Sequence, residues 1–441
     1  MTSPSSGKRR VAITGIGLVT PVGNDVETTW QSLLAGRSGG APVTLFDASG
    51  FTVRIAAEVK GLADDALGDR RLLKHSVRAH RFALVAAEQA LRDAGIRPTE
   101  ADATRWGCAV GSGMMTSEFA DLSTLFHHSA TDGEMHPGRL LSDPAATDPM
   151  VFSRSNANAG LALLTRRHGI RGYATSVHTA CASGGQALGT ALKLIRRGAV
   201  DRVLAGGFDS MISPIGIAGF CLLSATSPDN DSPQTASRPF DATRNGFLLG
   251  EGAGFVVLEE WELARARGAR IYAELAGDGN SLSSYRITDS PPDGDGPIQA
   301  MRAALKDAGA TPADIDYLNA HGTSTGMNDR SESAATRAVF GSEVERLKVS
   351  STKSSMGHLI AAAGAVEIAV CALAIQRGEM PVNANYRVPD PDCDLNFVLG
   401  APHRQHVRMA MSNSFGFGGS NSCVVLRHPA QVDGGPVASL A

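Results

Sequence analysis

The chain of 441 residues contains two segments that recur in the same order. Residues 88–102, EQALRDAGIRPTEAD, are matched by residues 302–316, RAALKDAGATPADID. Residues 182–198, ASGGQALGTALKLIRRG, are matched more loosely by residues 362–378, AAGAVEIAVCALAIQRG. Two matches in one order predict a duplicated structural unit. Chance similarity between alanine-rich helices is the alternative, and it applies mainly to the second pair.

Short apolar runs alternate with segments of helical periodicity, which predicts an α/β fold with buried strands. Strands are expected at residues 11–17, 201–207 and 254–260. A helix is expected at residues 82–94, because its composition favours helix and Gly95 suits the position after a helix end. The boundary between the duplicated units should fall near residues 264–271, which gives halves at 9–265 and 266–427.

Composition excludes several classes of protein. Lys and Arg (41) nearly balance Asp and Glu (44), so no global charge draws the chain to nucleic acid or to an anionic membrane. The six cysteines form no CxxC pair and no zinc-ligand cluster, so a reducing cytoplasm and no bound metal are expected. No apolar run is expected to approach the roughly 18 residues that span a bilayer.

The first strand is followed by GIGLVTPVG, which is similar to a dinucleotide-binding fingerprint. Thr20 stands where the third glycine should be, and no acidic ribose partner completes the unit. The segment is therefore interpreted as a structural strand and turn, and no redox cofactor is expected.

Cys181, in TACASGG, is a candidate nucleophile. A single buried cysteine is more often an inert apolar side chain. The second repeat, however, places Cys181 at the start of a helix, where the helix dipole and free N–H groups are expected to lower the pKa of a thiol and to bind an oxyanion. The other cysteines are interpreted as packed core residues.

Two histidines follow in glycine-rich segments that link strands to helices. His321 lies in NAHGTST, and His358 lies in STKSSMGHL together with Lys353. One thiol with two imidazoles exceeds what simple hydrolysis by a Cys–His pair requires. Two imidazoles can each donate to one carbonyl oxygen and so stabilise an enolate beside a thioester.

Four motifs, TACASG, NAHGTST, STKSSMGHLIAAAG and NSFGFGGSN, occur in this order and at these separations. Together they resemble the β-ketoacyl-acyl-carrier-protein synthases, closest to the type II synthase branch, over residues 11–426. The resemblance implies a thiolase fold: two pseudo-two-fold-related halves in a five-layered αβαβα core, usually in a dimer.

The same resemblance implies roles for the catalytic residues. Cys181 is expected to accept the acyl group as a thioester, and His321 and His358 to promote decarboxylation of a malonyl thioester and hold the enolate oxygen. Lys353 is expected to orient the loop of the second histidine, with Glu367 as its ion-pair partner. The reaction is a decarboxylative Claisen condensation that extends a fatty-acid or polyketide chain by two carbons, without a metal or redox cofactor.

Substrate-binding residues follow from the resemblance in the same way. Thr323 and Thr325 are expected to bind the phosphopantetheine arm of an acyl carrier protein. Phe417 is expected to act as a gate and to supply an oxyanion-hole N–H, while Phe415 lines the gate and Met114 lies near a position that limits chain length.

The carrier protein is an acidic helical partner in this family. Residues 68–81 concentrate basic side chains around a helix start, and Arg70, Arg71, Lys74 and Arg78 are expected to dock the carrier in a salt-sensitive way. A solvated charged face is the alternative interpretation.

Two segments depart from the family pattern: residues 115–150, and residues 206–227 with the bulky Phe220 and Leu222. Because of them, the sequence does not determine the length and unsaturation of the acyl chain or the pathway. It also leaves two candidates for the dimer partner: a second copy, or a chain-length factor in a specialised polyketide or polyene system. TACASG also differs from the TGCTSG typical of the aromatic polyketide branch. A degradative coenzyme A thiolase and a noncatalytic chain-length factor are the alternatives; the paired histidines oppose the first, and Cys181 opposes the second.

Overall fold

The computed structural model describes residues 8–62, 67, 71–113, 117–142 and 148–431 of the chain. Within these residues the strands of the main sheet fall into two sets of five. The first set is β1 (Val11–Val19), β4 (Trp106–Ser112), β7 (Ala174–Val177), β8 (Arg202–Ser210) and β9 (Glu251–Glu260). The second set is β10 (Ala273–Leu282), β11 (Tyr317–Asn319), β12 (Lys348–Ser350), β15 (Met409–Phe415) and β16 (Ser420–Arg427).

The order of these strands reveals the duplication. From the centre outward the first set runs β1-β9-β8-β4-β7, and the second set runs β10-β16-β15-β11-β12, so each strand has a counterpart in the other half. The central strands β1 and β10 pair antiparallel. The predicted strands at residues 11–17, 201–207 and 254–260 are confirmed as β1, β8 and β9.

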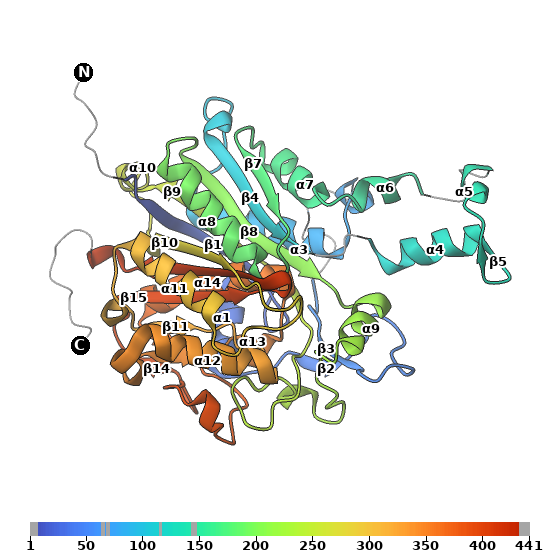
Figure 1. The fold of residues 1–441 in the computed structure, drawn as a ribbon. Coiled ribbons are helices and arrows are strands. Elements are labelled where there is room, and N and C mark those ends of the chain that lie inside the picture. Colours follow the sequence, from blue (N-terminus) through green and yellow to red (C-terminus); the bar gives the residue numbers. More distant parts are fainter. Residues whose placement is uncertain (1–7, 63–66, 68–70, 114–116, 143–147, 432–441) are drawn as a thin grey trace.

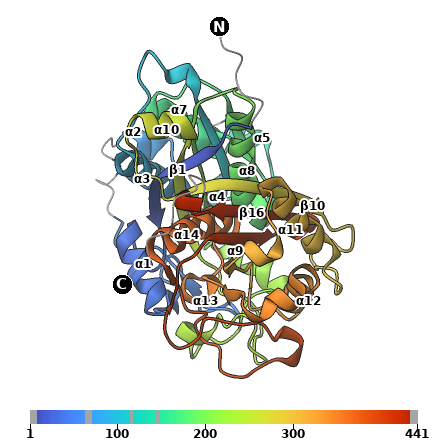
Figure 2. The ribbon, with the colours of Figure 1, turned by 90° about the vertical axis from the view of Figure 1, so that its left-hand side faces the viewer.

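The helices form layers on and between these strands (Figure 1). Two central helices, α8 (Ser183–Arg196) and α14 (Ala363–Arg377), pack on each other and on strands of both halves. The outer side of the first half is covered by α3 (Arg78–Ala94) and α7 (Ala159–His168), and that of the second half by α11 (Asp295–Ala308), with α12 (Gly326–Phe340) beside it. This is the five-layered thiolase fold; Figure 2 shows α14 and α11 from the side.

The predicted helix at residues 82–94 is confirmed as part of α3, which begins four residues earlier and ends at Gly95 in a left-handed conformation. The divergent segment 115–150 forms α4 (Phe119–Ser129), the hairpin β5 (Ala130–Thr131) and β6 (Glu134–Met135), and α5 (Gly138–Ser142) where the structure describes it. In Figure 1 these elements extend away from the layered core.

The remaining elements are short and surround the core. The helices are α1 (Val26–Leu34), α2 (Arg71–Lys74), α6 (Met150–Arg154), α9 (Pro214–Leu222), α10 (Trp261–Ala266) and α13 (Lys353–Met356). Two small ladders pair β2 (Gly40–Pro42) with β3 (Ile55–Ala57), and β13 (Glu379–Met380) with β14 (His403–Arg404).

Glycines in the two central strands let a helix approach each of them closely. A Cβ atom on Gly17 of β1 would lie 1.9 Å from the carbonyl oxygen of Ala86 in α3, and one on Gly279 of β10 would lie 2.1 Å from that of Ala300 in α11. The GxG of the first strand thus has a packing role, as the structural interpretation predicts. The same close contact occurs in both halves, so the outer helices α3 and α11 pack in equivalent ways.

The expectation that no segment reaches membrane-spanning length is wrong for one stretch. Residues Ile360–Arg377 are 18 residues long with a mean hydropathy of 1.6, but 89% of the stretch is buried inside the protein. It contains α14, which is apolar all round because protein layers surround it.

Replacing Gly17 with Ala should destabilise the protein by about 1–3 kcal/mol, because the added methyl group overlaps the backbone of α3. The free energy of unfolding in urea provides the measurement. Gly50→Ala is the matched control, since a Cβ there meets nothing within 4 Å. Equal stability of the two variants would contradict the close approach of strand and helix.

Candidate active site

Cys181 lies in a short 3-10 turn, Ala180–Ala182, that leads directly into α8. The corresponding turn of the other half, Ile360–Ala362, leads into α14. Each turn begins with a non-glycine residue of positive φ, 49° at Ala180 and 46° at Ile360. Such values are uncommon outside glycine, so their recurrence marks the two turns as structural equivalents.

The starts of α8 and α14 pack against each other through glycines. A Cβ on Gly184 would lie 2.7 Å from the backbone nitrogen of Ala365, and one on Gly364 would lie 2.8 Å from that of Gly185. No larger side chain fits at either position without moving the helices. This contact brings the turn that carries Cys181 next to the segment that carries His358.

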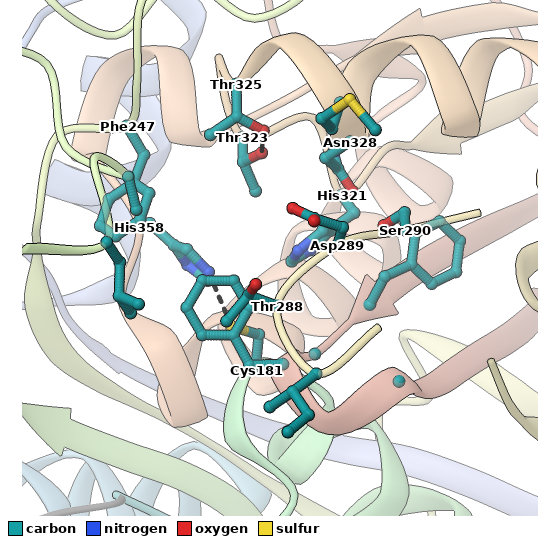
Figure 3. A pocket seen from close by; sticks show the side chains of 18 of the residues that line it. Cys181, Phe247, Thr288, Asp289, Ser290, His321, Thr323, Thr325, Asn328 and His358 are labelled. Carbon is teal, nitrogen blue, oxygen red and sulfur yellow. Dashed lines mark hydrogen bonds between the residues drawn. The ribbon is translucent and has the colours of Figure 1, made fainter. Parts of the chain in front are cut away.

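The His358 imidazole faces the Cys181 sulfur, with Nε2 and Sγ 3.0 Å apart (Figure 3). The backbone N–H of Ile360 donates to Nδ1 of the same ring at 3.2 Å. Because Nδ1 accepts this bond, the neutral ring carries its proton on Nε2. Nε2 is therefore a donor directed into the site.

His321 follows β11 and lies beside His358, with 5.3 Å between the ring centroids. Its backbone N–H donates to Oε1 of Glu332 at 2.8 Å, and its ring Nδ1 has no hydrogen-bond partner among the described residues. Burial lowers the pKa of both His321 and His358 well below the usual value, so both rings are neutral at neutral pH.

Two acidic residues of α12 that sequence reasoning missed hold the His321 segment. Glu332 accepts the N–H groups of His321 and Gly322 at 2.8 and 2.7 Å, and Asp329 accepts that of Thr323 at 2.9 Å. Burial raises the pKa of Glu332 to about 7. One sequence signal could have found them. Asp329 and Glu332 are three residues apart, so they lie on the same face of a helix, and they follow NAHGTST closely in the chain.

Lys353 and Glu367 form a salt bridge behind the histidines. Both side chains are almost completely buried. The Lys353 charge lowers the pKa of both His321 and His358, and the ion pair joins α13 to α14. The predicted pairing of these two residues is present in the structure.

The expectation that the helix start gives Cys181 a low pKa is wrong in direction. Burial raises the pKa of this thiol to about 12, and this effect outweighs the lowering by Lys353 and by the N–H groups of Phe417 and of Cys181 itself. The sulfur therefore carries its proton in the closed site. The two backbone N–H groups still point to this position and are the candidate oxyanion donors.

Cys181 and the two histidines line a cavity of about 320 Å³ (Figure 3). Four other predicted site residues also line it: Thr323, Thr325, Phe415 and Phe417. The hydroxyl oxygens of Thr323 and Thr325 lie 2.9 Å apart on one wall, and Figure 3 places Thr288, Asp289 and Ser290 on a loop that borders the same cavity. Met114 lies outside the described residues.

The structure describes three of the four predicted docking residues. Arg71 and Lys74 are exposed on α2, and Arg70 lies outside the described residues. Arg78 is partly exposed, and its guanidinium forms two hydrogen bonds to the buried Glu251 carboxylate, at 2.8 and 2.5 Å. Glu251 needs this partner because an unpaired buried carboxylate is costly.

The site also has the atoms of a possible metal centre. The Cys181 sulfur and one nitrogen of each histidine lie within 4.8 Å of one another. A soft thiolate with two imidazoles is a ligand set that suits zinc. In the structure, His358 directs its Nε2 proton at the sulfur, which is the arrangement of a thiol–imidazole pair.

Comparison with known proteins places this arrangement in a family. Residues 8–264 match the beta-ketoacyl synthase N-terminal domain, and residues 272–387 match the beta-ketoacyl synthase C-terminal domain. The 3-oxoacyl-acyl-carrier-protein synthase 2 of Coxiella burnetii (strain RSA 493 / Nine Mile phase I) is 40% identical over 419 residues, 95% of this chain and 98% of that protein.

Two solved structures are similar throughout. The AntDE:AntF complex, a type II polyketide synthase carrier protein with its ketosynthase bound to the hexaketide, matches with a TM-score of 0.85 and 32% identity, covering 96% of this chain and 99% of that chain. The ishigamide ketosynthase/chain length factor matches with a TM-score of 0.84 and 37% identity over the same shares.

A duplicated thiolase fold with one thiol and two neutral imidazoles in a single cavity defines a class of carbon–carbon bond-forming acyltransferases. The chain belongs to the beta-ketoacyl synthase family, and it is a ketosynthase. The resemblance seen in the sequence motifs is confirmed.

Lys353→Met should destabilise the protein by about 3–5 kcal/mol, because Glu367 is left as an unpaired buried carboxylate. Lys353→Met combined with Glu367→Leu should recover most of this loss, since an apolar pair of similar volume carries no buried charge. Urea denaturation of the two variants gives the comparison. A double variant no more stable than the single one would contradict the assignment of an isolated ion pair.

Proposed function

We propose that the enzyme extends an acyl group held on Cys181 by two carbons, using a malonyl group carried by an acyl carrier protein. The observation that carries this proposal is the convergence of one thiol, two N–H donors and two neutral imidazoles on one cavity. Acyl transfer and decarboxylation each require stabilisation of a negative oxygen, and the cavity offers a separate donor pair for each.

In the first step, the Cys181 sulfur attacks the carbonyl carbon of an acyl thioester on the carrier. The N–H groups of Cys181 and Phe417 stabilise the tetrahedral oxyanion. The carrier's sulfur leaves and takes the proton lost from Cys181, so the enzyme holds the acyl group as a thioester. Since the free thiol is protonated, removal of this proton is coupled to arrival of the substrate.

In the second step, malonyl thioester binds with its carbonyl oxygen between the two imidazoles. His358 donates through Nε2, as its tautomer requires, and the His321 imidazole, which lines the same cavity beside it, is the second donor. Loss of carbon dioxide leaves an enolate on this oxygen. Neutral imidazoles favour the enolate without protonating its carbon, and the buried site excludes water.

In the third step, the enolate carbon attacks the acyl carbonyl on Cys181 and the carbon–sulfur bond breaks. The product is a β-ketoacyl group on the carrier, and the Cys181 sulfur regains a proton from solvent. The overall reaction of the three steps consumes one proton and releases carbon dioxide and a free carrier thiol. No electron transfer occurs, so we propose that the reaction needs no metal and no redox cofactor.

The two threonines on the cavity wall are suited to the phosphopantetheine arm. Thr323 and Thr325 present hydroxyl groups beside His321, where amide groups of an extended arm can hydrogen-bond. Phe415 and Phe417 also line this cavity, and the ring centroid of Phe417 lies 6.4 Å from that of Phe220. Met114 remains a proposed determinant of chain length.

For the carrier protein, we propose docking through Arg71 and Lys74, with Arg70 as the adjacent cation. Arg78, whose partly exposed guanidinium also pairs with Glu251, remains a proposed member of this surface. Docking on exposed cations weakens as salt screens the charges. The AntDE:AntF structure, which contains a carrier protein and a ketosynthase, supports this kind of partner.

The dimer partner is either a second copy or a chain-length factor. Similarity to a ketosynthase of a type II polyketide synthase and to the ishigamide ketosynthase/chain length factor favours a specialised type II polyketide pathway as the second candidate, beside fatty-acid elongation. A coenzyme A thiolase is disfavoured: Cys423, near the C-terminus, is buried in β16 and does not line the cavity. We propose a cytoplasmic location, in keeping with six free cysteines.

Cys181→Ala should abolish acyl-enzyme formation and leave the fold intact, because the nucleophile is lost and only a few atoms are removed. Intact-protein mass spectrometry after incubation with acyl-carrier substrates of varied length and unsaturation provides the measurement. It also identifies which acyl groups the wild-type enzyme accepts. A variant that still captures acyl groups would refute the assignment of the nucleophile.

His321→Ala and His358→Ala should slow malonyl decarboxylation about 100-fold or more, as expected when an oxyanion donor is removed. Acylation of Cys181 should decline much less, because its oxyanion is held by backbone N–H groups. Release of labelled carbon dioxide and mass spectrometry of the acyl-enzyme measure the two half-reactions separately. Equal loss of both half-reactions would count against these roles.

A further inference from the structure

Asp209 is a buried carboxylate close to the catalytic centre that the mechanism above does not use. It is the penultimate residue of β8 and is 1% exposed. One oxygen, Oδ1, accepts the N–H of Ser210 at 2.8 Å, and the other, Oδ2, accepts the N–H of Ala361 at 3.0 Å. The space is built for this group, because a Cβ on Gly113 would lie only 2.2 Å from Oδ1.

The bond to Ala361 joins Asp209 to the segment that carries His358. Ala361 is the middle residue of the 3-10 turn before α14, and the preceding N–H, that of Ile360, donates to the His358 ring. Two consecutive N–H groups of one turn therefore hold a catalytic imidazole and a buried carboxylate. Movement of the turn relative to Asp209 would move the imidazole relative to Cys181.

The duplication explains why an anion lies here. The repeats align Ala361 with Cys181, and the positive φ values of the residues before them support this equivalence. At Cys181, the turn N–H faces the reacting sulfur. At Ala361, the equivalent N–H faces the Asp209 carboxylate. The N-terminus of a helix favours a negative group. In the first half this position is left to the substrate oxyanion, whereas in the second half the Asp209 carboxylate occupies it.

The surroundings of Asp209 offer no compensating cation among the described residues. The nearest acidic group is Glu251 of β9, which accepts the Ser210 hydroxyl at 2.7 Å and is itself neutralised by Arg78. Burial raises the pKa of Asp209 to about 7, and the charge of Glu251 adds to this effect. The charge of Asp209 in turn raises the pKa of Cys181. A buried carboxylate without a paired cation lowers the stability of the fold, so Asp209 is expected to have a role other than stability.

We propose that Asp209 is a positioning residue: its carboxylate anchors the turn before α14, and through that turn it holds the His358 imidazole against the Cys181 sulfur. This proposal rests on the proposed function, since it concerns the same two half-reactions. Asp209 touches no substrate and acts only through the backbone of Ala361 and Ile360.

Asp209→Asn and Asp209→Glu test the proposal. An amide has only one acceptor oxygen, so Asp209→Asn leaves one of the two N–H groups unpaired and removes the charge. Asp209→Glu keeps the charge and displaces the turn. Both variants should slow malonyl decarboxylation at least about tenfold relative to acylation of Cys181, because small displacements of a catalytic group are costly.

The pH profile of Cys181 alkylation by iodoacetamide separates charge from position. Asp209→Asn should shift the profile about one unit to lower pH, since removal of a neighbouring negative charge favours the thiolate. Asp209→Glu should leave the pH profile of alkylation unchanged, because the negative charge is kept. Glu274→Gln is the matched control, because Glu274 is also a buried carboxylate but pairs with Arg10 and Arg427 and does not line the cavity. This variant should change neither the pH profile of alkylation nor the ratio of the two half-reactions.

The outcomes separate the two proposals. A wild-type enzyme that performs neither half-reaction would refute the proposed function. A working wild-type enzyme whose Asp209 variants keep the wild-type ratio of half-reactions would overturn the role of Asp209. If both Asp209 variants fail to fold while Glu274→Gln folds, Asp209 is a structural residue of the core and the positioning role is likewise overturned.

Discussion

The site depends on the close contact between the starts of α8 and α14. Glycines at 184 and 364 allow the two helices to touch through their backbones, and each helix begins with a turn that has one residue of positive φ. Because the helices come from different halves, this contact brings Cys181 within 3.0 Å of His358 across 177 residues of chain. The two halves thus supply two equivalent helix starts, of which one carries Cys181 and the other adjoins an imidazole and a buried carboxylate.

Burial then decides the protonation of the thiol and of the two imidazoles. The two histidines remain neutral, and the charge of Lys353 adds to this effect, whereas the Cys181 thiol remains protonated although the same charge lowers its pKa. Lys353 itself is tolerated because Glu367 pairs with it. A dry site of neutral donors suits a reaction whose charges exist only while substrate is bound, on the acyl oxyanion and then on the enolate oxygen. The helix start contributes its N–H donors, and these matter more than any lowering of the resting thiol pKa.

Sequence reasoning predicted the duplicated fold and a site shared by Cys181 and both histidines, because each leaves a local pattern: a repeat, a cysteine among small residues, and histidines in glycine-rich turns. It failed where the deciding partner is distant or is a backbone group. The thiol pKa was wrong because burial depends on the whole fold. The ion pair of Arg78 with Glu251 was missed because the two residues lie 173 positions apart. Glu332 and Asp209 were missed because their partners are N–H groups, which no side-chain motif records.

The central claim is that one cavity holds two separate oxygen-binding positions, a backbone pair for the acyl carbonyl and an imidazole pair for the malonyl carbonyl. A crystal structure of the acylated enzyme tests it most directly. The account predicts a thioester on Cys181 whose carbonyl oxygen accepts the N–H groups of Cys181 and Phe417, with His321 and His358 still open to the cavity. An acyl oxygen bound to either imidazole, or an acyl group on another residue, would contradict it.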